Sequence, residues 1–74
     1  MEKSKEKQER FRRLATARTN SVLKTLNTLG HCSNRSAYHY SEEEVKKIFS
    51  EIENAVRGVK SKFHYPRNNK KFSL

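Results

Sequence analysis

The chain has 74 residues, of which 17 are lysine or arginine and 8 are aspartate or glutamate, so its formal net charge is +9. This length allows one small domain, residues 1–74, and the single Cys32 excludes an internal disulfide. No apolar run is long enough for a membrane span or a signal-peptide core, so the composition predicts a cytoplasmic protein with no membrane partner.

Core-forming residues are few. Leucine, isoleucine, valine and phenylalanine together number 15 of 74 residues, close to the level at which composition begins to favour disorder. Strong helical periodicity argues against full disorder. We therefore expect ordered helices with flexible ends, and a core that a second copy or a partner completes.

A first helix is predicted over about residues 5–29, and the basic N-terminal segment, residues 1–10, is expected to be frayed where the helix begins. Apolar residues recur near one face of this helix and form a stripe. Arg18 and Thr19 interrupt the stripe, and Leu23 lies beside it. The stripe residues are Phe11, Leu14, Ala15, Val22, Leu26 and Leu29. Several threonines and asparagines are mediocre helix formers, so packing must support this helix. Gly30 is the predicted stop, because glycine readily takes the left-handed conformation just past a helix end.

The connection HCSNRSAYHY, residues 31–40, is longer than most links between paired helices, and we expect it to be ordered. Asn34, Arg35 and Tyr38 are its candidate contact residues, since Arg35 could meet a phosphate or a carboxylate. The alternative is that the aromatic residues cap the end of a helical hairpin. The sequence favours that alternative, because loop aromatics near a helix start commonly serve packing.

A second helix is predicted over about residues 42–63. Ser41 and Glu44 have the spacing of a capping box, and Tyr40 and Val45 that of a hydrophobic staple. Acidic residues fill the first turn and basic residues the last, as the helix dipole favours. A single apolar stripe follows the helix: Val45, Ile48, Phe49, Ile52, Val56, Val59 and Phe63. Beyond it, residues 64–74 are predicted to form a flexible basic tail, because Pro66 ends any helix.

These elements predict an all-α fold, an antiparallel two-helix hairpin. Residues 1–13 carry six basic and three acidic groups, residues 14–53 five of each, and residues 54–74 six basic and none acidic. An antiparallel hairpin would bring the first and last segments to one open end, which would then hold the whole net charge. Two hairpins could also form a four-helix bundle as a homodimer, because the stripes leave apolar flanks uncovered.

The open end is the predicted binding site. Its partner would be nucleic acid, bound through the phosphate backbone with low sequence specificity, or a protein complex that contains nucleic acid. The proposed contact residues are Arg10, Arg12, Arg13, Arg57, Lys60, Lys62, Arg67, Lys70 and Lys71. Phe11, Phe63, His64 and Tyr65 lie among them and could stack on unpaired bases. The competing interpretation is a solvated, basic surface that keeps a small domain soluble.

Catalysis and metal binding are not expected. His31, Cys32, His39 and His64 include zinc-type donors, but 31 and 32 are adjacent and no C-x-x-C pair accompanies them. A cysteine nucleophile would need a pocket and an oxyanion hole, which two helices hardly provide. We therefore predict no metal, no cofactor and no enzymatic activity.

A second function is consistent with the same residues. The chain could be a protein-binding inhibitor or adaptor of the kind that phages and plasmids carry, occupying a groove on a larger enzyme. A membrane-surface helix is disfavoured, because acidic residues such as Glu51 and Glu53 lie on the polar face of the second helix. No motif identifies a family.

Overall fold

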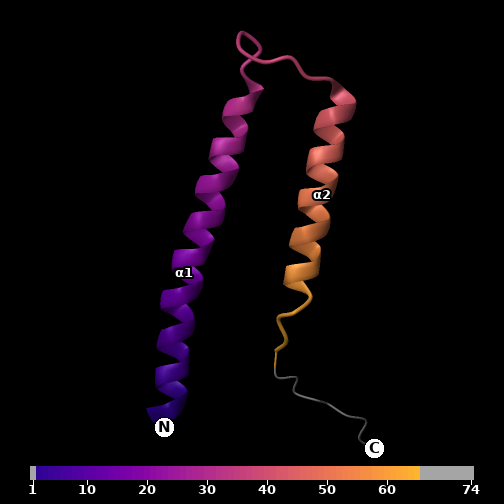
Figure 1. The fold of residues 1–74 in the computed structure, drawn as a ribbon. Helices are drawn as coiled ribbons and strands as arrows, with labels where there is room; N and C mark the ends of the chain where they lie inside the picture. Colours follow the sequence, from indigo (N-terminus) through magenta and orange to yellow (C-terminus); the bar gives the residue numbers. More distant parts are fainter. Residues whose placement is uncertain (1, 66–74) are drawn as a thin grey trace, which may run out of the picture. The chain divides into compact units, whose positions relative to one another are not determined.

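The computed structural model describes residues 2–65, and most of them are helical (Figure 1). In chain order it has the α-helix α1, Glu2–Gly30, the short 3-10 helix η1, His31–Ser33, and the α-helix α2, Glu42–Lys60. The predicted all-α class is confirmed. Neither described helix is apolar over a stretch long enough to cross a bilayer. Predictions for Met1 and for residues 66–74, most of the basic tail, lie outside the described residues.

The chain divides into two compact units, Met1–His39 with α1 and η1, and Tyr40–Leu74 with α2. The antiparallel pairing of α1 with α2, and the four-helix bundle, therefore stay predictions.

Local interactions support α1, which begins three residues before the predicted start. Glu6 and Glu9 each precede an arginine by four residues, the order that best stabilises a helix. The hydroxyls of Thr25 and Thr28 donate hydrogen bonds to the carbonyls of Ser21 and Lys24, at 2.9 and 3.1 Å. These bonds satisfy the threonine hydroxyls inside the helix, so only their methyl groups need an apolar neighbour.

The left-handed conformation predicted for Gly30 is wrong. Gly30 is the last residue of α1, with φ −59° and ψ −23°, and no glycine of the described chain has a positive φ. The chain does not reverse at this point, because η1 continues the right-handed turn. Hydrogen bonds that span three residues, as in a 3-10 helix, take the place of the left-handed cap. The last of them runs from the amide of Asn34 to the carbonyl of His31.

The connection forms a compact turn around Asn34. Its side-chain oxygen accepts a hydrogen bond from the Ser36 amide at 3.0 Å, and its carbonyl accepts from Ala37 and Tyr38 at 3.1 and 2.9 Å. An asparagine that binds the backbone two residues ahead favours this kind of turn. The segment therefore has structure of its own, as its length suggested.

The predicted capping box begins α2. The Glu44 amide donates to the Ser41 hydroxyl at 3.1 Å, and the Ser41 amide donates to the Glu44 carboxylate at 2.8 Å. Tyr40 and Val45 are both half-buried, as a hydrophobic staple requires. The start of α2 is thus fixed by residues on either side of the helix boundary.

The end of α2 comes at Lys60, three residues before the predicted end. The amides of Lys62 and Phe63 donate to the carbonyls three residues back, and the Ser61 hydroxyl donates to the carbonyl of Gly58 at 2.8 Å. These shorter bonds satisfy carbonyls that an α-helix leaves open at its end. The stripe residue Phe63 therefore lies in a tightened turn beyond the helix.

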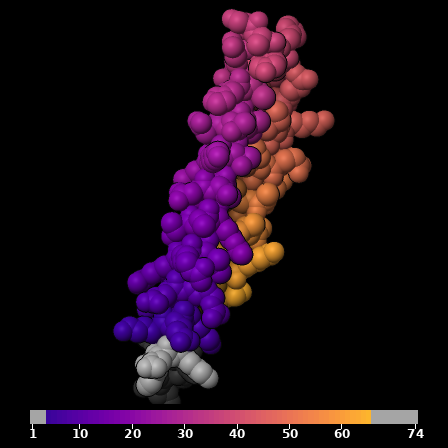
Figure 2. Space-filling model, turned by 60° about the vertical axis from the view of Figure 1, so that its left-hand side comes forward, coloured from indigo at the N-terminus to yellow at the C-terminus, as the bar shows by residue number. Residues whose placement is uncertain are grey.

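No described residue is buried. Figure 2 shows one face of the molecule in space-filling form, coloured along the chain. Phe11 in α1 is 57% exposed and Phe49 in α2 is 45% exposed. Most other stripe residues keep similar fractions, while Leu14, Leu29, Val45 and Ile52 are half-buried. Both helices thus present apolar faces that still have area to bury.

Replacing Ser41 with alanine should remove the cap and lower the stability of α2 by about 1 kcal/mol. Far-UV circular dichroism during thermal unfolding measures the change. Ser50→Ala is the matched control, since Ser50 is exposed within α2 and alanine is the better helix former there. Equal effects of the two substitutions would mean that the capping box contributes nothing.

Replacing Gly30 with alanine should raise stability by roughly 0.5–1 kcal/mol. The reason is that Gly30 is right-handed and an added Cβ would meet nothing within 4 Å. The same melting experiment tests it. A left-handed Gly30 would instead make the alanine variant less stable, by about 1–2 kcal/mol.

Candidate nucleic-acid interface

The described site residues fall into two helical clusters and one loop, and all of them are exposed. Arg10, Arg12 and Arg13 lie in α1, Arg57 and Lys60 in the last turn of α2, and Lys62 two residues after it. Asn34, Arg35 and Tyr38 lie in the connection. Arg67, Lys70 and Lys71 lie outside the described residues.

The three arginines of α1 do not form one surface. Arg10 and Arg13 are three residues apart and so lie on neighbouring positions of the helix, whereas Arg12 points to a different side. Glu6 and Glu9 stand four residues before Arg10 and Arg13 and offset part of their charge. This cluster is therefore weaker, as an anion site, than its count of arginines suggests.

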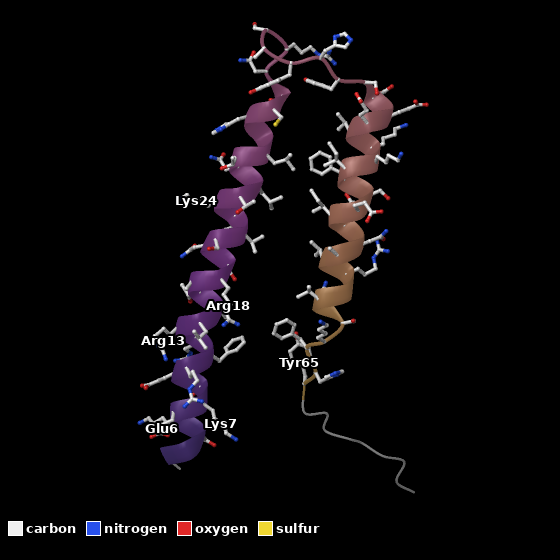
Figure 3. All side chains as sticks on the ribbon, viewed as in Figure 1. Glu6, Lys7, Arg13, Arg18, Lys24 and Tyr65 are labelled. Carbon is white, nitrogen blue, oxygen red and sulfur yellow. The ribbon has the colours of Figure 1, made fainter. Side chains whose placement is uncertain are left out.

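Two cations of α1 outside the predicted site have no acidic residue within four positions. Lys24 lies on the same side of the helix as Arg13, eleven residues and about three turns further on, while Arg18 projects from the opposite side (Figure 3). Counting charge by segment overlooked Lys24, because its segment is neutral overall. Reading the spacing from Arg13 would have found it.

The end of α2 is the more concentrated cluster. The Arg57 guanidinium donates one hydrogen bond to the side-chain oxygen of Asn54 at 3.3 Å, which positions the group and leaves further N–H donors. Lys60 and Lys62 follow, and no acidic residue occurs after Glu53. Arginine and lysine groups in this setting suit phosphate oxygens.

Aromatic side chains accompany this cluster. Phe63 is 54% exposed and Tyr65 is 81% exposed, within three residues of Lys62. Exposed rings beside cations can stack on unpaired bases, which makes single-stranded nucleic acid a better fit than a rigid duplex.

Arg57 and Lys60 also have a structural role, since cations in the last turn stabilise the helix dipole. That role accounts for charges inside the helix only. Lys62 lies beyond it, and so do the three basic residues of 66–74 in the sequence. The run of positive charge is thus longer than helix capping requires.

The connection is a weaker candidate for contact. The Asn34 oxygen is already engaged by Ser36, so it helps to hold the turn. Tyr38 is 53% exposed, which offers surface to a partner but does not distinguish contact from capping. Cys32 is exposed as a free thiol, and the described residues contain no group of three or more donors able to hold a metal ion.

Comparison with known proteins adds no relative: no family model matches the chain, and no curated protein or solved structure matches it. The site must therefore be judged on its own charges and geometry.

Proposed function

We propose that the protein binds nucleic acid through the basic segment that begins at Arg57, by contacts to the phosphate backbone and without catalysis. The observation that carries the proposal is the charge asymmetry of the chain after Glu53, where six basic residues occur and no acidic one. A continuous positive segment attracts a polyanion and releases its counterions.

The aromatic residues favour a single strand over a duplex. Phe63 and Tyr65 could each stack on a base while Arg57, Lys60 and Lys62 contact phosphates. Nothing in this arrangement reads base edges, so sequence preference should be slight.

We further propose that α1 and α2 pair as an antiparallel hairpin with a definite register. Each helix has six positions spaced by four, three, four, three and four residues: 11, 15, 18, 22, 25 and 29 in α1, and 45, 49, 52, 56, 59 and 63 in and after α2. This is the spacing of a coiled-coil seam. Antiparallel pairing sets Leu29 opposite Val45, Val22 opposite Ile52, and Phe11 opposite Phe63.

The two polar positions of the α1 seam are compatible with this register. Thr25 has its hydroxyl bonded to Ser21 and can offer its methyl group to Phe49. Arg18 would face Val56, where its long stem can pack while the guanidinium reaches the edge of the seam. A charge in the seam penalises other registers.

This hairpin would add to the binding site. With Phe11 opposite Phe63, the arginines at 10, 12 and 13 come to the same end as Lys60 and Lys62. The two basic clusters, each moderate alone, would form one anion-binding end. An adaptor role is the competing function, in which the apolar face of α2 occupies a groove of another protein instead.

A salt titration tests the binding proposal. With a fluorescent single strand, three phosphate contacts should lower affinity about 20-fold between 50 and 200 mM salt, and six contacts about 300-fold. Replacing both Arg57 and Lys60 with glutamine should flatten the logarithmic salt slope by about 1.4, since two contacts are lost. Fluorescence anisotropy supplies the measurement, and circular dichroism checks that α2 persists.

The matched control replaces Lys46 and Lys47 with glutamine, which removes the same charge from exposed positions nearer the acidic start of α2. Its salt slope should stay that of the parent chain. Equal loss in both double variants would show that net charge alone attracts the strand. Absence of binding at low salt to single strands, duplexes and structured RNA would favour the adaptor.

Replacing Ile52 with aspartate tests the hairpin, because it sets a charge in the centre of the proposed seam. The free energy of unfolding should fall by an amount on the order of 3 kcal/mol, because the seam would then bury an unpaired charge. Helical content should fall with it. Asn54→Asp adds the same charge on the polar side of α2 and should change little. Similar melting curves for the two variants would mean that Ile52 faces water.

A further inference from the structure

The proposed hairpin has two unlike flanks, and the inference drawn here rests on that pairing. The residues that precede the seam positions 15, 22, 29, 49, 56 and 63 form one flank, which we name the low-charge flank: Leu14, Ser21, Thr28, Ile48, Ala55 and Lys62. The residues that follow the other seam positions form the opposite, charged flank: Arg12, Thr19, Leu26, Lys46, Glu53 and Lys60. The low-charge flank carries a single charge, Lys62 just beyond the end of α2, whereas the opposite flank carries four: Arg12, Lys46, Glu53 and Lys60.

We propose that a second copy of this chain docks on the low-charge flank, so that two hairpins form a four-helix bundle in which α1 packs against α2 of the partner. The apolar arc of α2 extends onto this flank, since Ile48 is 42% exposed and belongs to the same stripe as Phe49 and Ile52. A second copy offers the same surface, and a twofold interface uses one patch twice.

Charge at the rim of the flank decides the orientation. Four residues before each flank position, α1 carries Arg10, Ala17 and Lys24, whereas α2 carries Glu44, Glu51 and Gly58. Contact of α1 with the other α1, or of α2 with the other α2, would oppose like charges. Contact of α1 with the partner's α2 instead joins a basic rim to an acidic one.

The register of the hairpin sets which rim residues meet. A twofold axis parallel to the helices brings Lys24 level with Glu51 of the second copy. Lys24 has no acidic neighbour in its own helix, and neither side chain has a hydrogen bond or ion pair with another described residue. The proposed contact would give each of them a partner.

Gly58 supplies an independent observation. It lies within α2 in right-handed conformation, where glycine costs about 1 kcal/mol relative to alanine. An added Cβ would meet nothing within 4 Å in its own chain. In the proposed bundle Gly58 is level with Ala17 of the second copy, where the missing side chain allows the two helices to approach closely.

This orientation also bears on binding. An axis parallel to the helices places the basic segments of both copies at the same end of the bundle. One nucleic-acid strand could then engage both segments, and the second contact would gain from the high local concentration that the first creates.

A charge swap tests the interface in the intact chain. Light scattering should give a mass twice the 8.7 kDa of one chain. Lys24→Glu alone and Glu51→Lys alone should each weaken the dimer about tenfold, since each change turns two symmetric attractions into repulsions. The double variant should restore dimerisation. Lys46→Glu on the charged flank is the control and should leave the mass unchanged.

Gly58→Ala is the second variant, because it favours helix formation yet fills the space at the interface. The melting temperature of its helix should not fall, but its dimer should dissociate more readily than that of the parent chain. A monomeric parent chain, or a double swap no more dimeric than the single variants, would overturn the inference. If a monomer binds the strand in a salt-dependent way, only the proposed dimer is overturned. If the chain is a dimer that binds no strand, only the proposed function is overturned.

Discussion

One constraint governs this molecule: an amphipathic helix cannot cover its own apolar face. Free energy from apolar burial accrues only where a second surface removes water, at about 25 cal/mol per Å². The described chain has no buried residue, so α1 and α2 are each supported by local terms such as the capping box of Ser41 in α2 and the four-residue glutamate–arginine spacings of α1. In proteins, most of the stability of a helix comes from packing of its apolar face. Whatever covers the stripes therefore decides how stable the protein is and how it presents its charges.

The apolar residues of α2 and the residues proposed for binding lie on different parts of the helix. Apolar residues from Val45 to Val59 form a single arc, and the charges lie outside it, with acidic groups at the start and basic groups at the end. Such separation lets the helix pack through one side while its last turn remains in solvent. Arg57 illustrates this, since its partner Asn54 is also a polar residue outside the arc. Within α2 the proposed binding end and the proposed packing surface therefore use different side chains, whereas Lys62 and Phe63, which follow the helix, belong to both.

Local features were the predictable ones. The start of α2 follows from Ser41 and Glu44, which contact each other over three residues, so their spacing alone predicts the cap. Gly30 was wrongly expected to be left-handed, because the choice between a left-handed cap and a continuing 3-10 turn depends on hydrogen bonds further along the chain, at Asn34. Lys24 was missed because segment charge ignores which side of a helix a residue occupies. Helix pairing is least predictable of all, since it depends on contacts between residues far apart in sequence.

The capping box has a further consequence, for the order of folding. Because Ser41 and Glu44 define the start of α2 without help from α1, this helix can begin to form at a fixed residue before any pairing occurs. A helix grows in about a microsecond or less, and a connection of this length closes faster still. In the proposed hairpin, pairing from the connection outward would require only short sequence separations at each step, the condition for rapid folding. The helix ends next to the connection would then pair first, and the basic residues proposed for binding would come together last.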